Sequence, residues 1–321
     1  MRKIAFLLTT LAIVPSYASD IDFSEAYIMR DQMKPNQITL GGIQVGEEST
    51  QYQVDFLTDE NYRLIPQLEA VTAENSDNKQ SLWHIYKLLK SRKWVNLTHP
   101  FDGDIPHWKG FSPMTTKALY TYDDGFLVLE YCHVGQWGTH IDPPAHFFEG
   151  LRTQEQIGVE EMLLPLVVLD VHEKVAENPD YQLTMEDITT WEAKHGQVPE
   201  GAFVAMRTDW SKRWPNQDAM QNVDDKGVAH YPGWSMDTLK YLYEERHITA
   251  SGHEPTDTDP GVATTLDDYS LESYILSLDK YQIELLANLD QVPEAGALVS
   301  VTWPNAKGGT GFPARVFAIL P

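Results

Sequence analysis

The feature that most constrains the fold of this chain is a series of five short apolar runs after residue 90. They read WVNLTHPF, GFLVLEYCHV, LPLVVLDV, GAFVAMRT and ALVSVTW, and each is typical of a β-strand. Segments with helical periodicity lie between them, at Thr184 to His195, Ser235 to Arg246 and Tyr269 to Leu278. Strands that alternate with helices predict an α/β domain over residues 81–321.

The region before this domain divides into two parts. Arg2 and Lys3 precede an apolar run, residues 4–14, that is too short to cross a bilayer and is followed by small residues. This pattern is typical of a cleavable secretory signal, so we predict that residues 1–18 are removed and that the protein is periplasmic or secreted. A buried N-terminal helix is the alternative. Residues 19–80 mix turn signals with short apolar clusters and are interpreted as an N-terminal extension.

Two predictions concern the core. Apolar residues recur at helical spacing in SLWHIYKLLK and predict a stripe that faces the core, formed by Leu82, Ile85, Tyr86 and Leu89. Cys132 is the only cysteine, so an internal disulfide is impossible and the fold must depend on apolar packing. Because Cys132 lies in an apolar run, we predict that it is buried.

The charge of the chain narrows the class of partner. Its 47 acidic and 24 basic residues give a net charge of −23, and the acidic residues are scattered along the chain. Nucleic acids and anionic membranes would repel such a protein, so neither is expected as a partner. No later run approaches the length of a membrane span. A small molecule is the expected partner.

The segment GQWGTHIDPPAHFF, residues 135–148, places ligand-type side chains on a stiff backbone. On an extended chain His140 and Asp142 leave the same face about 6–7 Å apart, close enough to converge on one cation. Two prolines then fix two φ angles and remove two backbone donors, which holds His146 just beyond the turn. The residues alone leave two interpretations open, a rigid metal cradle and a tight turn with incidental histidines.

Several motifs together carry a resemblance to a known family. QWGTHIDPPAHF resembles the His-x-Gly-Thr-His-x-Asp-x-Pro-x-His signature of the cyclase-like metal-dependent hydrolases, which include bacterial kynurenine formamidases and isatin hydrolases. NLTHPFDGDIPHWKG, FVAMRTDWSKRW, GHEPTDTD and IELLANLDQVPEAGALV resemble further family segments in the same order. The resemblance covers residues 92–321. It implies a β-rich cyclase-type fold of swivelling β/β/α-like architecture with flanking helices, assembled as a homo-oligomer.

The resemblance also implies a ligand set. His140, Asp142 and Glu284 would bind a divalent metal ion, and His146 would be the acid/base residue. Two positions depart from the family pattern, because Gln136 and Glu272 stand where the family has histidines. As alternatives to metal binding, Gln136 closes the turn by a hydrogen bond and Glu272 is solvated. Replacing imidazole nitrogen by oxygen donors favours Mn²⁺ over a two-zinc site.

The predicted chemistry follows from such a site. A bound cation lowers the pKa of its water from near 16 toward ~7 and polarises a carbonyl group. With an ordinary pKa near 6.5, His146 is suited to accept a proton and return it to the leaving atom. We therefore predict a metal-dependent hydrolase of a small amide, cyclic amide or lactone, such as an aryl formamide or an isatin-like compound. The alternatives are a periplasmic small-molecule-binding protein on the same scaffold, with catalysis lost, and a metal-assisted lyase.

Other residues are secondary candidates. Three aromatic side chains are candidates for the wall of a pocket for a flat substrate, with packing as the alternative for each: Trp108, Trp137 and Phe147. His133 is interpreted as a structural histidine. GHEPTDTD lacks the spacing of a calcium loop and is interpreted as structural support for the site. KGGTG, residues 307–311, is interpreted as a loop before the last strand.

Overall fold

The computed structural model describes residues 37–39, 44–45, 48–49, 53–55 and 81–321. The predicted signal, residues 1–18, lies outside the described residues, as does most of the predicted N-terminal extension. Within that extension the described pieces form two small antiparallel pairs, of β1 (Gln37–Thr39) with β4 (Gln53–Asp55) and of β2 (Gln44–Val45) with β3 (Glu48–Ser49). The chain divides into two compact units, Met1–Leu82 and Trp83–Pro321.

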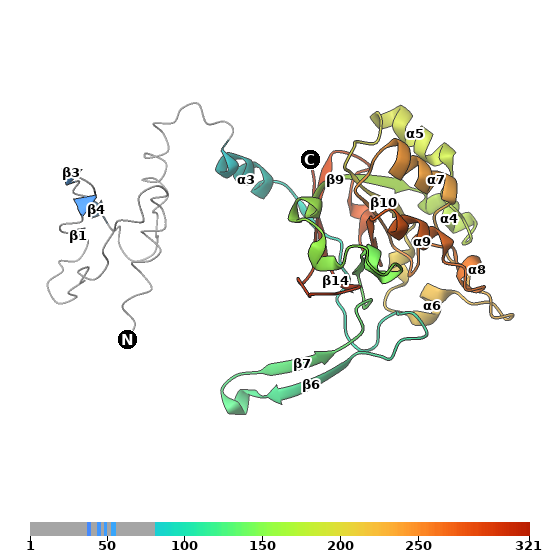
Figure 1. Cartoon of the computed structure of the whole chain (residues 1–321), viewed down its shortest axis with the longest axis horizontal. Helices are drawn as coiled ribbons and strands as arrows, with labels where there is room; N and C mark the ends of the chain where they lie inside the picture. The colour runs from blue at the N-terminus through green and yellow to red at the C-terminus, as the bar shows by residue number, and fades with distance from the viewer. Residues whose placement is uncertain (1–36, 40–43, 46–47, 50–52, 56–80) are drawn as a thin grey trace. The chain divides into compact units, whose positions relative to one another are not determined.

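The second unit is built on one curled, nine-stranded mixed sheet with the order β14-β8-β12-β11-β10-β9-β13-β15-β5 (Figure 1). Its strands are β5 (Trp94–Asn96), β8 (His140–Asp142), β9 (Leu163–Asp170), β10 (Phe203–Arg207), β11 (Ala250–His253), β12 (Tyr281–Glu284), β13 (Ala297–Thr302), β14 (Phe312–Pro313) and β15 (Arg315–Ile319). β9, β10, β11 and β12 pair in parallel, and the strands outside them pair antiparallel. The predicted α/β class is confirmed.

Helices connect the parallel strands. They are α4 (His172–Glu177), α5 (Met185–His195), α6 (Gln217–Gln221), α7 (Met236–Lys240), α8 (Gly261–Thr264) and α9 (Ser270–Ser277). Short turns of 3₁₀ helix are η4 (Tyr122–Asp124), η5 (Pro144–His146), η6 (Gln154–Gln156), η7 (Val159–Met162), η8 (Trp210–Arg213) and η10 (Leu289–Gln291). The predicted helix after Ser235 combines α7 with a π-helical turn, η9 (Tyr241–Glu245). Within the described ranges, none of the helices has the length and apolar character that crossing a membrane requires.

The central strands are buried on both faces. Val204 and Met206 of β10 join the apolar cluster under α4, α5, α7 and α9, whereas Phe203 and Ala205 join the cluster on the other face. Successive side chains of a strand point to opposite faces, so a continuous apolar run is what a doubly covered parallel strand needs. This explains why the runs that form β9 and β10 were recognisable in the sequence.

The run GFLVLEYCHV forms a strand outside the main sheet. Among the strands that the structure describes, β7 (Val128–Cys132) pairs with β6 (Thr115–Tyr120) alone, and the resulting hairpin extends away from the sheet (Figure 1). Every residue of both strands is exposed. The prediction that Cys132 is buried is therefore wrong, because its apolar neighbours belong to this hairpin and not to the core.

The predicted core-facing stripe of the first helix is also wrong. The helix itself is present as α3 (Leu82–Lys90), but none of its nine residues is buried. Leu82 is 81% exposed, and Ile85 and Tyr86 are 42% and 52% exposed. Helical periodicity shows that a helix has an apolar face but not what covers that face. In the described part of the chain both faces of the sheet are covered by other elements.

Candidate metal centre and active site

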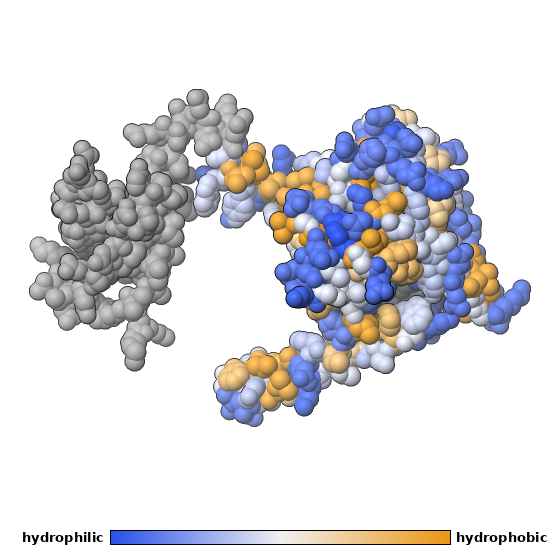
Figure 2. Space-filling model, in the orientation of Figure 1, coloured by the Kyte–Doolittle hydropathy of each residue, from blue (hydrophilic) through white to orange (hydrophobic). Residues whose placement is uncertain are grey.

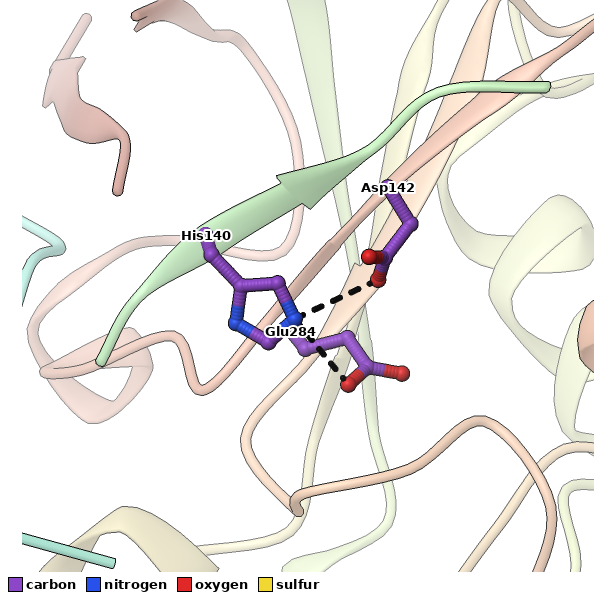
Figure 3. A group of neighbouring side chains, drawn as sticks. All are labelled: His140, Asp142 and Glu284. Atoms are coloured by element: carbon purple, nitrogen blue, oxygen red, sulfur yellow. Dashed lines mark ion pairs between the residues drawn. The ribbon is translucent and has the colours of Figure 1, made fainter. Parts of the chain in front are cut away.

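The pairing of β8 with β12 places the three principal ligand candidates on one face of the sheet. In this antiparallel ladder Glu284 lies opposite His140, and Gln282 lies opposite Asp142. Since side chains alternate along a strand, the intervening isoleucines enter the apolar cluster on the other face. Figure 3 shows the three polar side chains turned toward one another, across the two strands.

Distances within this group suit a single cation. His140 Nε2 lies 3.4 Å from Asp142 Oδ2 and 3.5 Å from Glu284 Oε2, and all three residues are buried. His140 Nδ1 lies 2.8 Å from the carbonyl oxygen of Gly138, to which it donates its proton in the neutral ring. Nε2 is then unprotonated and faces the two carboxylates, as a metal-binding imidazole requires. Asp142, His140 and Glu284 therefore fit a divalent cation.

A second group shares Asp142 with the first. Asp142 Oδ1 and Glu272 Oε1 each lie 3.9 Å from His146 Nε2. Asp142 Oδ1 is buried and has no hydrogen-bond partner, as expected of an oxygen that faces a cation. Glu272 is buried, so the alternative of a solvated glutamate does not hold. The structure thus brings Glu272 and His146 to the same centre as the three principal candidates.

The clustered, buried carboxylates of the centre favour the binding of a cation. Burial raises the pKa of Glu284 and of Glu272 well above the ordinary range, and the nearby Asp142 carboxylate raises both further. Burial also acts on Asp142, but His140, when its ring is protonated, outweighs burial and lowers the pKa of Asp142 to about 2. Like charges that share a buried space repel one another unless a proton or a cation compensates them. A divalent ion supplies that compensation.

Residues behind the centre hold its carboxylates. Gln282 Nε2 donates to Glu284 Oε1 at 3.0 Å and to Asp142 Oδ2 at 3.4 Å. Asp259 accepts hydrogen bonds from the backbone N–H groups of Leu271 and Glu272, at 2.9 and 3.1 Å. The segment GHEPTDTD therefore supports the site. Gln282 was missed in the sequence, although its position two residues before Glu284 on a strand would have placed it on the same face.

Gln136 lies at the edge of the centre, beside His146. Its Nε2 donates to the carbonyl oxygen of Thr310 at 2.7 Å and lies 3.3 Å from His146 Nδ1. This arrangement matches the alternative interpretation, a hydrogen bond that closes the turn. The acceptor belongs to the loop of residues 307–311, which leads into β14 and so ties the two segments together.

The three aromatic candidates lie in different surroundings. Trp137 is fully buried with Ile105 and Met114, so packing describes its position. Phe147 is 40% exposed and its ring centre lies 5.0 Å from that of His146. A cavity of about 600 Å³ opens beside Phe147 and His146. Trp108 is partly exposed and donates to Tyr269 Oη at 3.2 Å, outside the residues that line this cavity.

Comparisons with known proteins identify the family of this chain. The Cyclase family model matches residues 95–260, about half of the chain. The chain belongs to this family. It is 33% identical over 208 residues to an isatin hydrolase from Roseibium aggregatum, a match that covers 63% of the chain and 78% of the relative. It is 27% identical over 89 residues to a kynurenine formamidase from Bacillus anthracis, with 26% and 41% covered.

Solved structures of family members share the fold. Isatin hydrolase A from Labrenzia aggregata, bound to benzyl benzoate, matches with a TM-score of 0.70 and 33% identity. The match covers 75% of this chain and 99% of that chain. These relatives identify the protein as an enzyme, a hydrolase that acts on amide C–N bonds. They do not support the alternative of a binding protein that has lost catalysis.

Proposed function

We propose that this enzyme is a metal-dependent hydrolase of a small, flat cyclic amide or aryl formamide, of the isatin or formylkynurenine type. The observation that carries the proposal is the convergence of His140, Asp142 and Glu284 beside a partly exposed histidine, His146, at the edge of a cavity. Isatin hydrolases and kynurenine formamidases among its relatives support the same substrate class.

We propose His140, Asp142 and Glu284 as the ligands of one divalent ion, with Mn²⁺ favoured because carboxylate oxygens outnumber nitrogen in this set. When bound, the ion supplies an acidified water and a polarised substrate carbonyl. The imidazole of His146 lies beside the centre, where it can take a proton from the attacking water and return it to the leaving nitrogen. Phe147 borders the cavity, where its ring can stack against an aromatic substrate.

Turnover in labelled water tests this proposal. The full-length enzyme, reconstituted with Mn²⁺, is incubated with isatin and with N-formylkynurenine in H₂¹⁸O, and the products are analysed by mass spectrometry. We expect one solvent oxygen in the carboxylate that is formed. Product without solvent oxygen would show lyase chemistry, and binding without product from either compound would contradict a hydrolase of this class. The matched control is His140→Ala, which should give no product.

We further propose that the enzyme is a homo-oligomer and that the hairpin of β6 and β7 contacts a second copy. Figure 2 shows apolar surface gathered along this hairpin. Its exposed apolar side chains include Leu119, Tyr120, Phe126, Leu129 and Tyr131. An isolated two-stranded hairpin is at best marginally stable in water, and a contiguous apolar patch usually marks an interface. β7 also leads through residues 133–139 directly into β8, which connects this surface to the metal centre.

Substitution on the hairpin is expected to change the mass of the particle in solution. Leu119→Lys combined with Leu129→Lys places two charges in the proposed interface, so we expect light scattering to report a monomer where the wild type is an oligomer. Leu266→Lys is the matched control, because Leu266 is 81% exposed and lies outside the hairpin. A wild type that is monomeric, or a double variant that remains oligomeric, would rule out the hairpin as the interface.

A further inference from the structure

His253 is a buried histidine that the proposed mechanism does not use. It is the last residue of β11, and both His253 and Trp234 are fully inaccessible to solvent. The two ring nitrogens of His253 have different neighbours. The indole Nε1 of Trp234 lies 3.3 Å from Nδ1, and Glu284 Oε1 lies 3.4 Å from Nε2.

The indole group determines which nitrogen carries the proton. An indole N–H can only donate a hydrogen bond, so Nδ1 of His253 must accept it and must be unprotonated. An imidazole keeps at least one ring proton, which therefore resides on Nε2, the nitrogen that faces Glu284. The opposite tautomer would turn two N–H groups toward each other at Nδ1. It would also turn a nitrogen lone pair toward a carboxylate at Nε2.

The two oxygens of Glu284 are then distinguished. Oε1 faces two donors, the Nε2–H of His253 and the side-chain amide of Gln282 at 3.0 Å. Oε2 faces His140 Nε2, at the centre of the metal-ligand group. Donors on one oxygen restrain the rotation of the carboxylate and leave the other oxygen directed at the cation. Such outer hydrogen bonds orient metal ligands in many proteins.

We propose that Trp234 and His253 form a positioning relay, in which the indole holds His253 as the Nε2–H tautomer and this N–H aims Glu284 at the metal ion. The inference rests on the proposed metal site. His253 is a positioning residue and not a ligand, because the nitrogen nearest the centre carries a proton. This buried Nε2 forms no hydrogen bond, and Glu284 Oε1, 3.4 Å away, is the carboxylate oxygen that it faces, so packing alone would leave a polar group unsatisfied.

A matched pair of substitutions separates the relay from a role in packing. In His253→Gln the amide nitrogen takes the place of Nε2 and can still donate to Glu284. In His253→Asn the amide nitrogen takes the place of Nδ1 and cannot reach it. We expect His253→Asn to weaken Mn²⁺ binding to the full-length protein about 10–100-fold, the usual cost of losing an outer-shell partner, and His253→Gln to weaken it much less. Mn²⁺ affinity is measured by titration against a competing chelator.

The tautomer is tested separately in the metal-free wild type. Two-bond ¹H–¹⁵N spectra of protein labelled at histidine distinguish the two neutral tautomers, and the signal missing from His253→Gln identifies His253. We expect the proton on Nε2. A proton on Nδ1, or equal weakening of Mn²⁺ binding by the two substitutions, would overturn the relay alone. A wild type that binds no Mn²⁺ would overturn both the relay and the proposed metal site.

Discussion

Replacing Asp142 by alanine is expected to abolish stoichiometric metal binding and, with it, measurable turnover. Asp142 directs Oδ2 at His140 and Oδ1 at His146, so it is the one residue common to both ligand groups. Its loss removes a carboxylate whose pKa is held at about 2, and which is therefore ionised at neutral pH. We expect the affinity for Mn²⁺ to fall by more than the roughly 10–100-fold that loss of an outer-shell residue costs.

Elemental analysis of purified protein, wild type beside Asp142→Ala, measures this effect directly. Asp142→Asn keeps the shape of the side chain and tests whether charge is what matters. Asp237→Ala is the matched control, because Asp237 is an exposed aspartate in the first turn of α7 and should leave metal content unchanged. Stoichiometric metal in Asp142→Ala would refute the proposed site, whatever its effect on activity.

The part of the site that could be predicted from the residues alone is the local part. His140 and Asp142 are two residues apart, and a strand necessarily places such residues on one face. Glu284 is different, because its approach to His140 depends on the register between β8 and β12, which are far apart in the chain. No periodicity within either strand specifies that register. Glu284 was therefore accessible only through the family resemblance.

The difference between local spacing and contacts made only in the folded chain also explains which sequence predictions were wrong and which residues were missed. The apolar runs of β9 and β10 were recognised because burial on both faces leaves a continuous local signal. The exposure of α3 and of Cys132 depends on what covers an apolar surface, which no local pattern records. The contact between Trp234 and His253 was missed for a related reason. It joins a loop to the end of a strand, and no local pattern in the sequence places the two side chains together.

Replacing His146 by glutamine is expected to lower kcat by about 10²–10⁴-fold, the usual contribution of a general acid/base, while KM changes little. His146 is 28% exposed at the side chain, more than the ligands beside it, so it can reach both the centre and the cavity. Its Nε2 lies 3.9 Å from Asp142 Oδ1 and from Glu272 Oε1. His146 is therefore near enough to exchange a proton at the centre without being bound to the ion. Glutamine keeps the polarity of the side chain but cannot shuttle a proton at neutral pH.

Metal content decides between the two roles that the geometry allows for His146. If His146 is the acid/base residue, His146→Gln retains the same metal content as the wild type, about one ion per chain, although turnover is lost. If Asp142, His146 and Glu272 instead hold a second ion, the wild type contains two ions and the variant loses one. His172→Gln is the matched control, since His172 pairs with Asp170 away from both ligand groups and should change neither kcat nor metal content. An acid/base role requires that turnover falls while the bound metal remains.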